Sequence, residues 1–269
     1  MSFDCFIGID YSGAETPTSR LKGLQVYAAQ PGGGPVEAWA SPTRSNNGQR
    51  VNWTRQEVAE RLLQEVHKGT RFLAGIDHGF SMPVSYFARY GLESWPDFLS
   101  DFVHHWPTHN DHVYVDFVRD GNLYRTGDAP PPGTRTGSSD EFRLTERWTS
   151  SAKSVFLFDV QGSVAKSTHA GIPWLKWLRE QAGERLHVWP FDGWAIPSDK
   201  PVLVEVYPSI FRNRYEREGR TPDQQDAYAT ARWMREMHGR GALDGYFAPP
   251  LSLGERAVAD LEGWILGVR

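Results

Sequence analysis

Short apolar runs alternate with amphipathic stretches along the chain, and each apolar run predicts a buried strand. The strongest runs lie at residues 3–11, 71–77 and 201–207. The first two contain an acid at or near their ends, Asp10 and Asp77. Weaker patterns predict further strands at residues 23–30, 36–41, 154–160 and 186–190. A turn rich in glycine and proline separates the first two of these, which therefore predict a hairpin or a meander.

Amphipathic stretches with capping residues predict the helices. Residues 172–180 have a helical pattern, and residues 83–118 look helical with poor periodicity. Three further helices begin at residues suited to capping, which are Thr54, Thr221 and Ser252. Strands followed by a mixture of strands and helices predict an α/β fold with helices on both faces of the sheet.

Composition and charge narrow the class of protein. The net charge of −4 argues against a protein that coats nucleic acid non-specifically. Cys5 is the only cysteine, so the chain forms no internal disulfide. The first residues lack the basic segment of a secretory signal, and no apolar stretch is long enough to span a bilayer. We therefore expect a soluble, cytoplasmic protein without a membrane partner.

Several acids occupy positions from which they can meet in the fold. Asp10 and Asp77 end two buried strands, and Glu205 lies inside a third. Asp226 lies on the packing face of a late helix, with Asp223 one turn before it. Ligands gather at the carboxyl ends of strands in open α/β sheets. A helix packed across those ends would bring its acids to the strand acids.

Clustered carboxylates do not all stay ionised without cations. Hard oxygen ligands select Mg²⁺ or Mn²⁺, and two such ions about 4 Å apart clamp an in-line phosphoryl displacement. The pattern therefore predicts a metal-assisted displacement at a phosphoryl group, with water activated by one ion and the leaving oxygen stabilised by the other. The acids also have structural interpretations. Asp10 and Asp77 are residue types that form turns, and Asp223 would interact favourably with the helix dipole. Glu205 could form an ion pair with Arg212 or Arg214.

Residues 120–151 are the least regular stretch, and a loop of this length is usually functional or mobile. We expect this loop to offer Arg147 to a substrate. The segment that contains Ser163 and Lys166 has a faint likeness to a phosphate-binding loop, but Ala165 stands where that loop requires glycine. We expect Ser163 and Lys166 to contact a phosphate group nonetheless.

The acidic motifs resemble those of the ribonuclease H-like superfamily. They are Gly8-Ile9-Asp10, Gly75-Ile76-Asp77 and residues 222–227. The closest nuclease pattern is that of Holliday-junction resolvases, in which two strand acids and two acids three apart on the last helix bind the metals. Residues 162–164 and 205–208 also resemble family 429 of the domains of unknown function, whose members are predicted nucleases. Together the motifs extend from residue 3 to about residue 240.

The resemblance implies a single ribonuclease H-like domain over residues 1–269, with a mixed sheet of five strands and an irregular insertion around residues 83–151. It implies a nucleic-acid substrate and a divalent-metal site that hydrolyses phosphodiester bonds. The metal ligands that it implies are Asp10, Asp77, Asp223 and Asp226, and Glu205 matches a further motif acid. Asp77 stands where the resolvases have glutamate.

Two other functions fit parts of the sequence. A catalytically silent binding or scaffold protein would keep the fold and pair its acids in salt bridges. An actin-like ATPase shares the pattern of residues 8–13, but that fold normally needs two domains and a second glycine-rich phosphate turn. Binding of Mn²⁺ and of ATP separates these functions from a nuclease.

Overall fold

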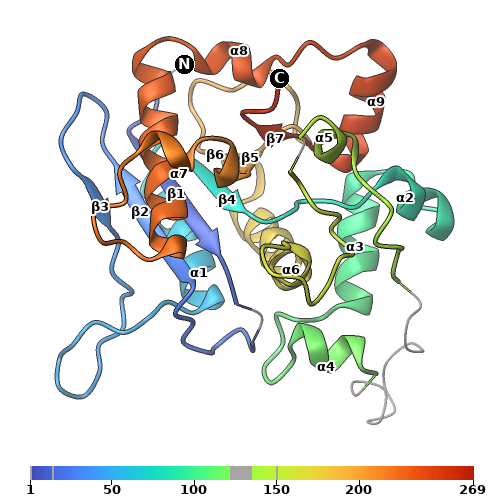
Figure 1. Ribbon diagram of the computed structural model, residues 1–269, viewed down its shortest axis with the longest axis horizontal. Coiled ribbons are helices and arrows are strands. Elements are labelled where there is room, and N and C mark those ends of the chain that lie inside the picture. The colour runs from blue at the N-terminus through green and yellow to red at the C-terminus, as the bar shows by residue number, and fades with distance from the viewer. Residues whose placement is uncertain (1, 14, 122–134, 150) are drawn as a thin grey trace.

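A mixed sheet forms the centre of the computed structural model, which describes residues 2–13, 15–121, 135–149 and 151–269 (Figure 1). Within these residues the sheet has seven strands in the order β3-β2-β1-β4-β6-β5, with β7 also paired to β6. The strands are β1 (Cys5–Tyr11), β2 (Leu24–Ala29), β3 (Val36–Ala38), β4 (Phe72–Asp77), β5 (His187–Val188), β6 (Val202–Val206) and β7 (Ile265–Leu266). The α/β class is confirmed, but the described sheet has two more strands than the five predicted.

The pairing of the strands brings the ends of β1 and β4 together. β1 pairs in parallel with β4, and Asp10 lies directly opposite Asp77 in the register. On its other edge β1 pairs with β2 in antiparallel orientation, and β2 pairs likewise with β3. The predicted hairpin is thus confirmed. β6 pairs in parallel with β4 on one edge and with the short strands β5 and β7 on the other.

Residues 154–160 form turns, so the strand predicted there is wrong. β5 and β7 already occupy the edge of β6 that β4 leaves free. The segment also turns at Asp159, whose φ of 58° is incompatible with a strand. Val155 and Phe156 are buried all the same, and Phe156 packs its ring against Tyr86. The apolar pattern reflects burial against helices, which a short run does not distinguish from a strand.

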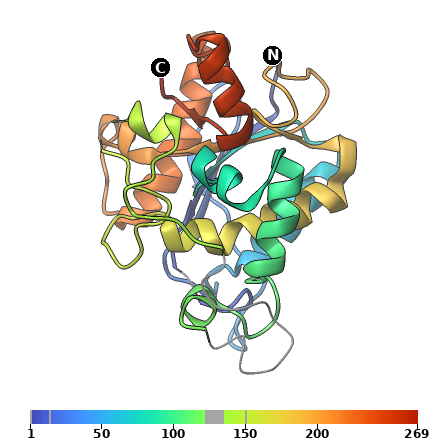
Figure 2. The ribbon, with the colours of Figure 1, turned by 90° about the vertical axis from the view of Figure 1, so that its right-hand side faces the viewer.

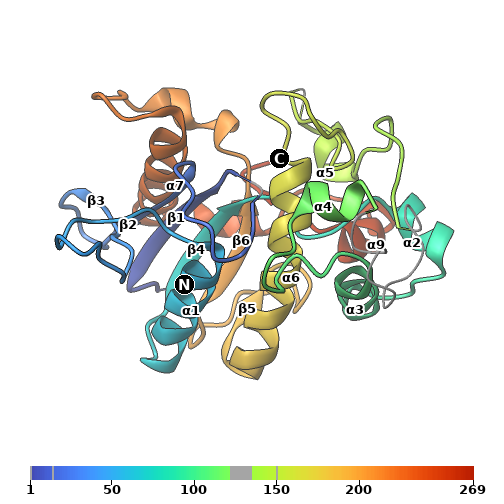
Figure 3. The ribbon, with the colours of Figure 1, turned by 90° about the horizontal axis from the view of Figure 1, so that it is seen from below.

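Helices cover both faces of the sheet, as predicted. α7 packs against β1 and β2 on one face, and α1 and α6 lie on the other (Figure 3). The α-helices of the described residues are α1 (Arg55–His67), α2 (Val84–Tyr90), α3 (Trp95–His105), α4 (Val115–Arg119), α5 (Leu144–Arg147), α6 (Ala165–Ala182), α7 (Pro222–Gly239), α8 (Leu243–Phe247) and α9 (Leu253–Glu262). Not one of them is both long enough and apolar enough to cross a membrane.

Local capping signals set the starts of three helices. The N-cap residues of α1, α7 and α9 are Thr54, Thr221 and Ser252, and each takes part in a capping box. α6 begins at Ala165, seven residues before the predicted helix at residues 172–180.

Much of the predicted irregular insertion is helical. α2 and α3 face the viewer in Figure 2, and their aromatic side chains are core residues. α4 and the short α5 lie in the same part of the sequence. Residues 122–134 and 150, which belong to the predicted loop, lie outside the described residues.

Candidate metal centre

Two glycines let α7 approach the sheet closely. A Cβ atom on Gly8 of β1 would lie 2.1 Å from the carbonyl oxygen of Ala227, and one on Gly75 of β4 would lie 2.9 Å from Cγ2 of Thr230. No side chain fits at Gly8 without a shift of the helix, and at Gly75 the side chain of Val206, 2.7 Å away, would have to move as well. Side chains alternate along a strand, so Gly8 and Asp10 face the same way, as do Gly75 and Asp77. The helix therefore lies directly over the strand ends that carry the two acids.

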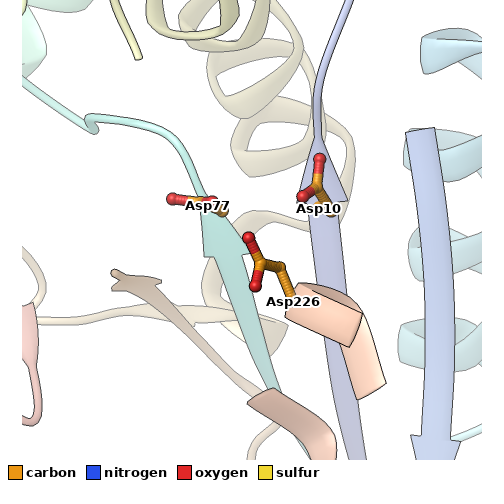
Figure 4. A group of neighbouring side chains, drawn as sticks. All are labelled: Asp10, Asp77 and Asp226. Carbon is orange, nitrogen blue, oxygen red and sulfur yellow. The ribbon is translucent and has the colours of Figure 1, made fainter. Parts of the chain in front are cut away.

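Three carboxylates from distant parts of the sequence meet at this edge of the sheet. Asp10 is the second-last residue of β1, Asp77 is the last residue of β4, and Asp226 lies on the first turns of α7. Figure 4 shows Asp226 reaching from the helix toward the space between the two strand ends. Each residue offers an oxygen atom within 4.8 Å of those offered by the other two. We call these residues the three-acid cluster.

Burial and mutual repulsion make ionisation of the cluster unfavourable. Burial raises the pKa of Asp10 to about 7, and the charges of Asp223 and Asp226 act in the same direction. The N–H of Ser12 donates to Oδ1 of Asp10 over 2.9 Å and opposes this shift. Burial also raises the pKa of Asp77 well above its usual range, with added repulsion from Asp10 and Asp226. A bound cation would remove this penalty.

Asp226 is only partly neutralised. Its Oδ2 accepts a hydrogen bond of 2.9 Å from Nη1 of Arg212, in the turn η4 (Arg212–Arg214). Its Oδ1 is buried and accepts no hydrogen bond from any described residue. Burial raises the pKa of Asp226, and Arg212 opposes that rise. A buried carboxylate oxygen without a donor suits a cation, because the oxygen loses its hydration and gains no other partner.

Asp223 lies beside the cluster and is not a member of it. It is half-buried on the first turn of α7, and burial raises its pKa. Its Oδ2 would be 3.4 Å from a Cβ atom on Gly23, which places it near the start of β2. The predicted fourth ligand thus lies one helical turn from Asp226, on the β2 side of the cluster.

Glu205 belongs to a different set of contacts. It is buried and receives two hydrogen bonds from the guanidinium of Arg143, of 2.5 and 2.7 Å, and one from the N–H of Phe80. Along β6, Val204 and Val206 face the α7 side of the sheet, so Glu205 points to the opposite face from Asp10 and Asp77. Its partner is Arg143 and not Arg212 or Arg214, the partners considered from the sequence. These contacts favour a structural role.

Ser163 and Lys166 line a pocket of about 280 Å³ together with Ser12 and Gly13, just beyond the end of β1. Lys166 is already paired there: its Nζ lies 2.9 Å from Asp116 and 2.8 Å from Asp159. The hydroxyl of Ser163 donates to the carbonyl oxygen of Leu157. Neither predicted phosphate ligand is therefore free of protein partners.

Lys153 is a cation that the sequence did not single out. It lines a narrow cavity together with Asp77 and Tyr207, and its Nζ donates to the carbonyl oxygen of Gln161. Among the described residues no carboxylate forms an ion pair with it, so it is better placed than Lys166 to meet an anion. Arg147, at the end of α5, is exposed. Its positive charge acts to lower the pKa of Glu262, against the rise that burial causes.

Comparison of the chain with protein-family models, with curated proteins and with solved structures finds no match.

Proposed function

We propose that the protein is a metal-dependent nuclease that hydrolyses phosphodiester bonds, with Mg²⁺ or Mn²⁺ bound by the three-acid cluster. The convergence of Asp10, Asp77 and Asp226 within 4.8 Å carries the proposal. The buried and unpartnered Oδ1 of Asp226 supports it, because carboxylate oxygens are the ligands that hard divalent ions prefer.

The residues around the cluster match the needs of this reaction. When bound, the metal would lower the pKa of a water molecule and neutralise charge on the phosphoryl oxygens. The N–H of Ser12 fixes the orientation of the Asp10 carboxylate. Arg212 and Lys153 place positive charge beside the acids. Binding of a phosphate backbone requires such charge. We assign Asp223 to a second ion, because it lies one turn from Asp226 outside the cluster.

Metal binding and cleavage together test the proposal. Calorimetry should detect two Mn²⁺ ions in the wild type and one in Asp223→Asn. Asp10→Asn and Asp226→Asn should each lower the cleavage of labelled DNA or RNA by at least about 100-fold, as expected when a charge-stabilising group is lost. Asp111→Asn, which removes an exposed acid that is not a member of the cluster, is the matched control.

The Arg212–Asp226 ion pair is the observation that favours a catalytically silent protein with paired acids. In that case wild type and Asp10→Asn would bind Mn²⁺ equally weakly. Undiminished cleavage by purified Asp10→Asn or Asp226→Asn would contradict the nuclease assignment.

A further inference from the structure

Arg212 is the cation that the fold places on the three-acid cluster. Its Nη1 lies 2.9 Å from Oδ2 of Asp226, and the structure gives the three acids no other ion pair among the described residues. The side chain of Asp226 is 13% exposed and that of Arg212 is 40% exposed. The acid is therefore held inside the site, while the guanidinium reaches it from the solvent side.

The backbone at Arg212 is fixed to the helix that carries Asp226. The side chain of Gln225 donates to the carbonyl oxygens of Arg212 and Tyr215, over 3.2 and 2.8 Å. On the other side, Phe211 stacks on Trp233 of α7 with a centroid distance of 4.6 Å. These contacts hold η4 against α7, whereas the long side chain of Arg212 is 40% exposed and borders the solvent.

The two oxygens of Asp226 have unequal environments. Oδ2 is satisfied by Arg212, whereas Oδ1 is buried without a partner. A divalent ion bound by the cluster and the guanidinium are two cations on the same carboxylate, and their charges repel each other. Occupancy by one therefore weakens occupancy by the other.

We propose that Arg212 is a built-in counter-ion that competes with the metal for Asp226 and swings toward solvent when the metal binds. This inference rests on the proposed metal site. In the released position the guanidinium stands at the rim of the cluster, where it can pair with an anionic phosphodiester. Arg212 is thus a positioning residue that couples metal loading to substrate binding.

Titration with Mn²⁺ of the full chain tests the competition. Arg212→Gln should bind Mn²⁺ about tenfold more tightly than the wild type, because a positive charge near the ion is lost. Arg214→Gln is the matched control: it makes the same change of charge in the same turn, at an exposed side chain with no ion pair to the cluster. Arg212→Lys, which keeps the charge, should bind about as weakly as the wild type.

Thermal unfolding gives a second measurement. Without metal, Arg212→Gln should have a lower Tm than Arg214→Gln, and Mn²⁺ should raise its Tm by a larger amount. Equal affinities for Mn²⁺ in Arg212→Gln and Arg214→Gln would overturn the competition and leave the metal site intact. Weaker binding by Arg212→Gln would also overturn it, since Arg212 would then support the site. Absence of Mn²⁺ binding by all variants would overturn both the competition and the metal site.

Discussion

At the scale of single residues, Asp10 is the member of the cluster that water reaches least, with 2% of its surface exposed. Its carboxyl group keeps its proton in the folded protein up to a pH of about 7, because burial raises its pKa from a usual value of 3.8. The unfolded chain loses the same proton near pH 4. The protonated carboxyl group therefore favours the folded state below about pH 4, and this contribution is lost as the pH rises to about 7.

The metal-free protein should show this loss as a fall in Tm between about pH 4 and pH 7. Asp10→Asn cannot ionise and keeps the oxygen that accepts from Ser12, so the pH dependence of its Tm should be flatter. At pH 8 the variant should be more stable than the wild type when metal is absent. Scanning calorimetry of both proteins in a chelating buffer measures the difference. Parallel curves over this pH range would show that Asp10 is not held in its protonated form.

At the scale of secondary-structure elements, the site depends on how closely α7 lies against β1. Gly8→Ala would put a methyl group 2.1 Å from the carbonyl oxygen of Ala227, so the helix must move outward. We expect unfolding free energy to fall by about 1–3 kcal/mol, as in other overpacked cores. Mn²⁺ binding should weaken as well, although every acid is still present, because Asp226 moves with the helix.

Gly239→Ala is the control for this change. Gly239 is the last residue of the same helix, and a Cβ atom there meets nothing within 4 Å. Alanine is the better helix former, so this variant should be as stable as the wild type or more stable by up to about 1 kcal/mol. Calorimetric titration with Mn²⁺ should distinguish the two substitutions. If Gly8→Ala binds the ion as tightly as Gly239→Ala, the close approach of the helix is not what shapes the site.

Elements with strong local signals could be predicted from the sequence. Capping residues marked the starts of α1, α7 and α9, and continuous apolar runs marked β1, β4 and β6. The strand predicted at residues 154–160 is wrong, because the burial of this segment depends on helices that lie far away in the sequence. β7 has two residues and exists only by pairing with β6, so it leaves no pattern of its own.

The candidate site, too, combines features that follow from local patterns with contacts that only the folded chain creates. The meeting of Asp10 and Asp77 follows from a simple rule, since neighbouring parallel strands end at one edge of the sheet. The surroundings of Glu205 and Lys166 do not follow from any local rule. Arg143 is 62 residues from Glu205, and Asp116 is 50 residues from Lys166, so only the folded chain brings these charges together.

At the scale of the whole molecule, Arg143 connects parts of the chain that are far apart in the sequence. It is buried and donates to Glu205 of β6, to Glu146 of α5 and to the carbonyl oxygen of Glu262 at the end of α9. The side chain of Glu262 in turn accepts from the N–H of Val84 at the start of α2. Removing one acid from this buried network takes a charged acceptor from Arg143, and a lost hydrogen bond to a charged group costs about 1.5–3 kcal/mol.

Glu205→Gln and Asp77→Asn should therefore have opposite effects on the stability of the metal-free protein, although both remove a carboxylate at or near the end of a parallel strand. Glu205→Gln should lower the free energy of unfolding by about 2 kcal/mol, since Arg143 loses the charged acceptor of two hydrogen bonds but keeps its ion pair with Glu146. It should leave Mn²⁺ affinity within about threefold of the wild type. Asp77→Asn should abolish Mn²⁺ binding at the three-acid cluster and stabilise the metal-free protein as the pH rises above the usual pKa of an aspartate, because burial raises the pKa of this acid. Chemical denaturation and Mn²⁺ titration of the two variants measure both quantities. Loss of Mn²⁺ binding in Glu205→Gln without loss of stability would instead place Glu205 among the metal ligands.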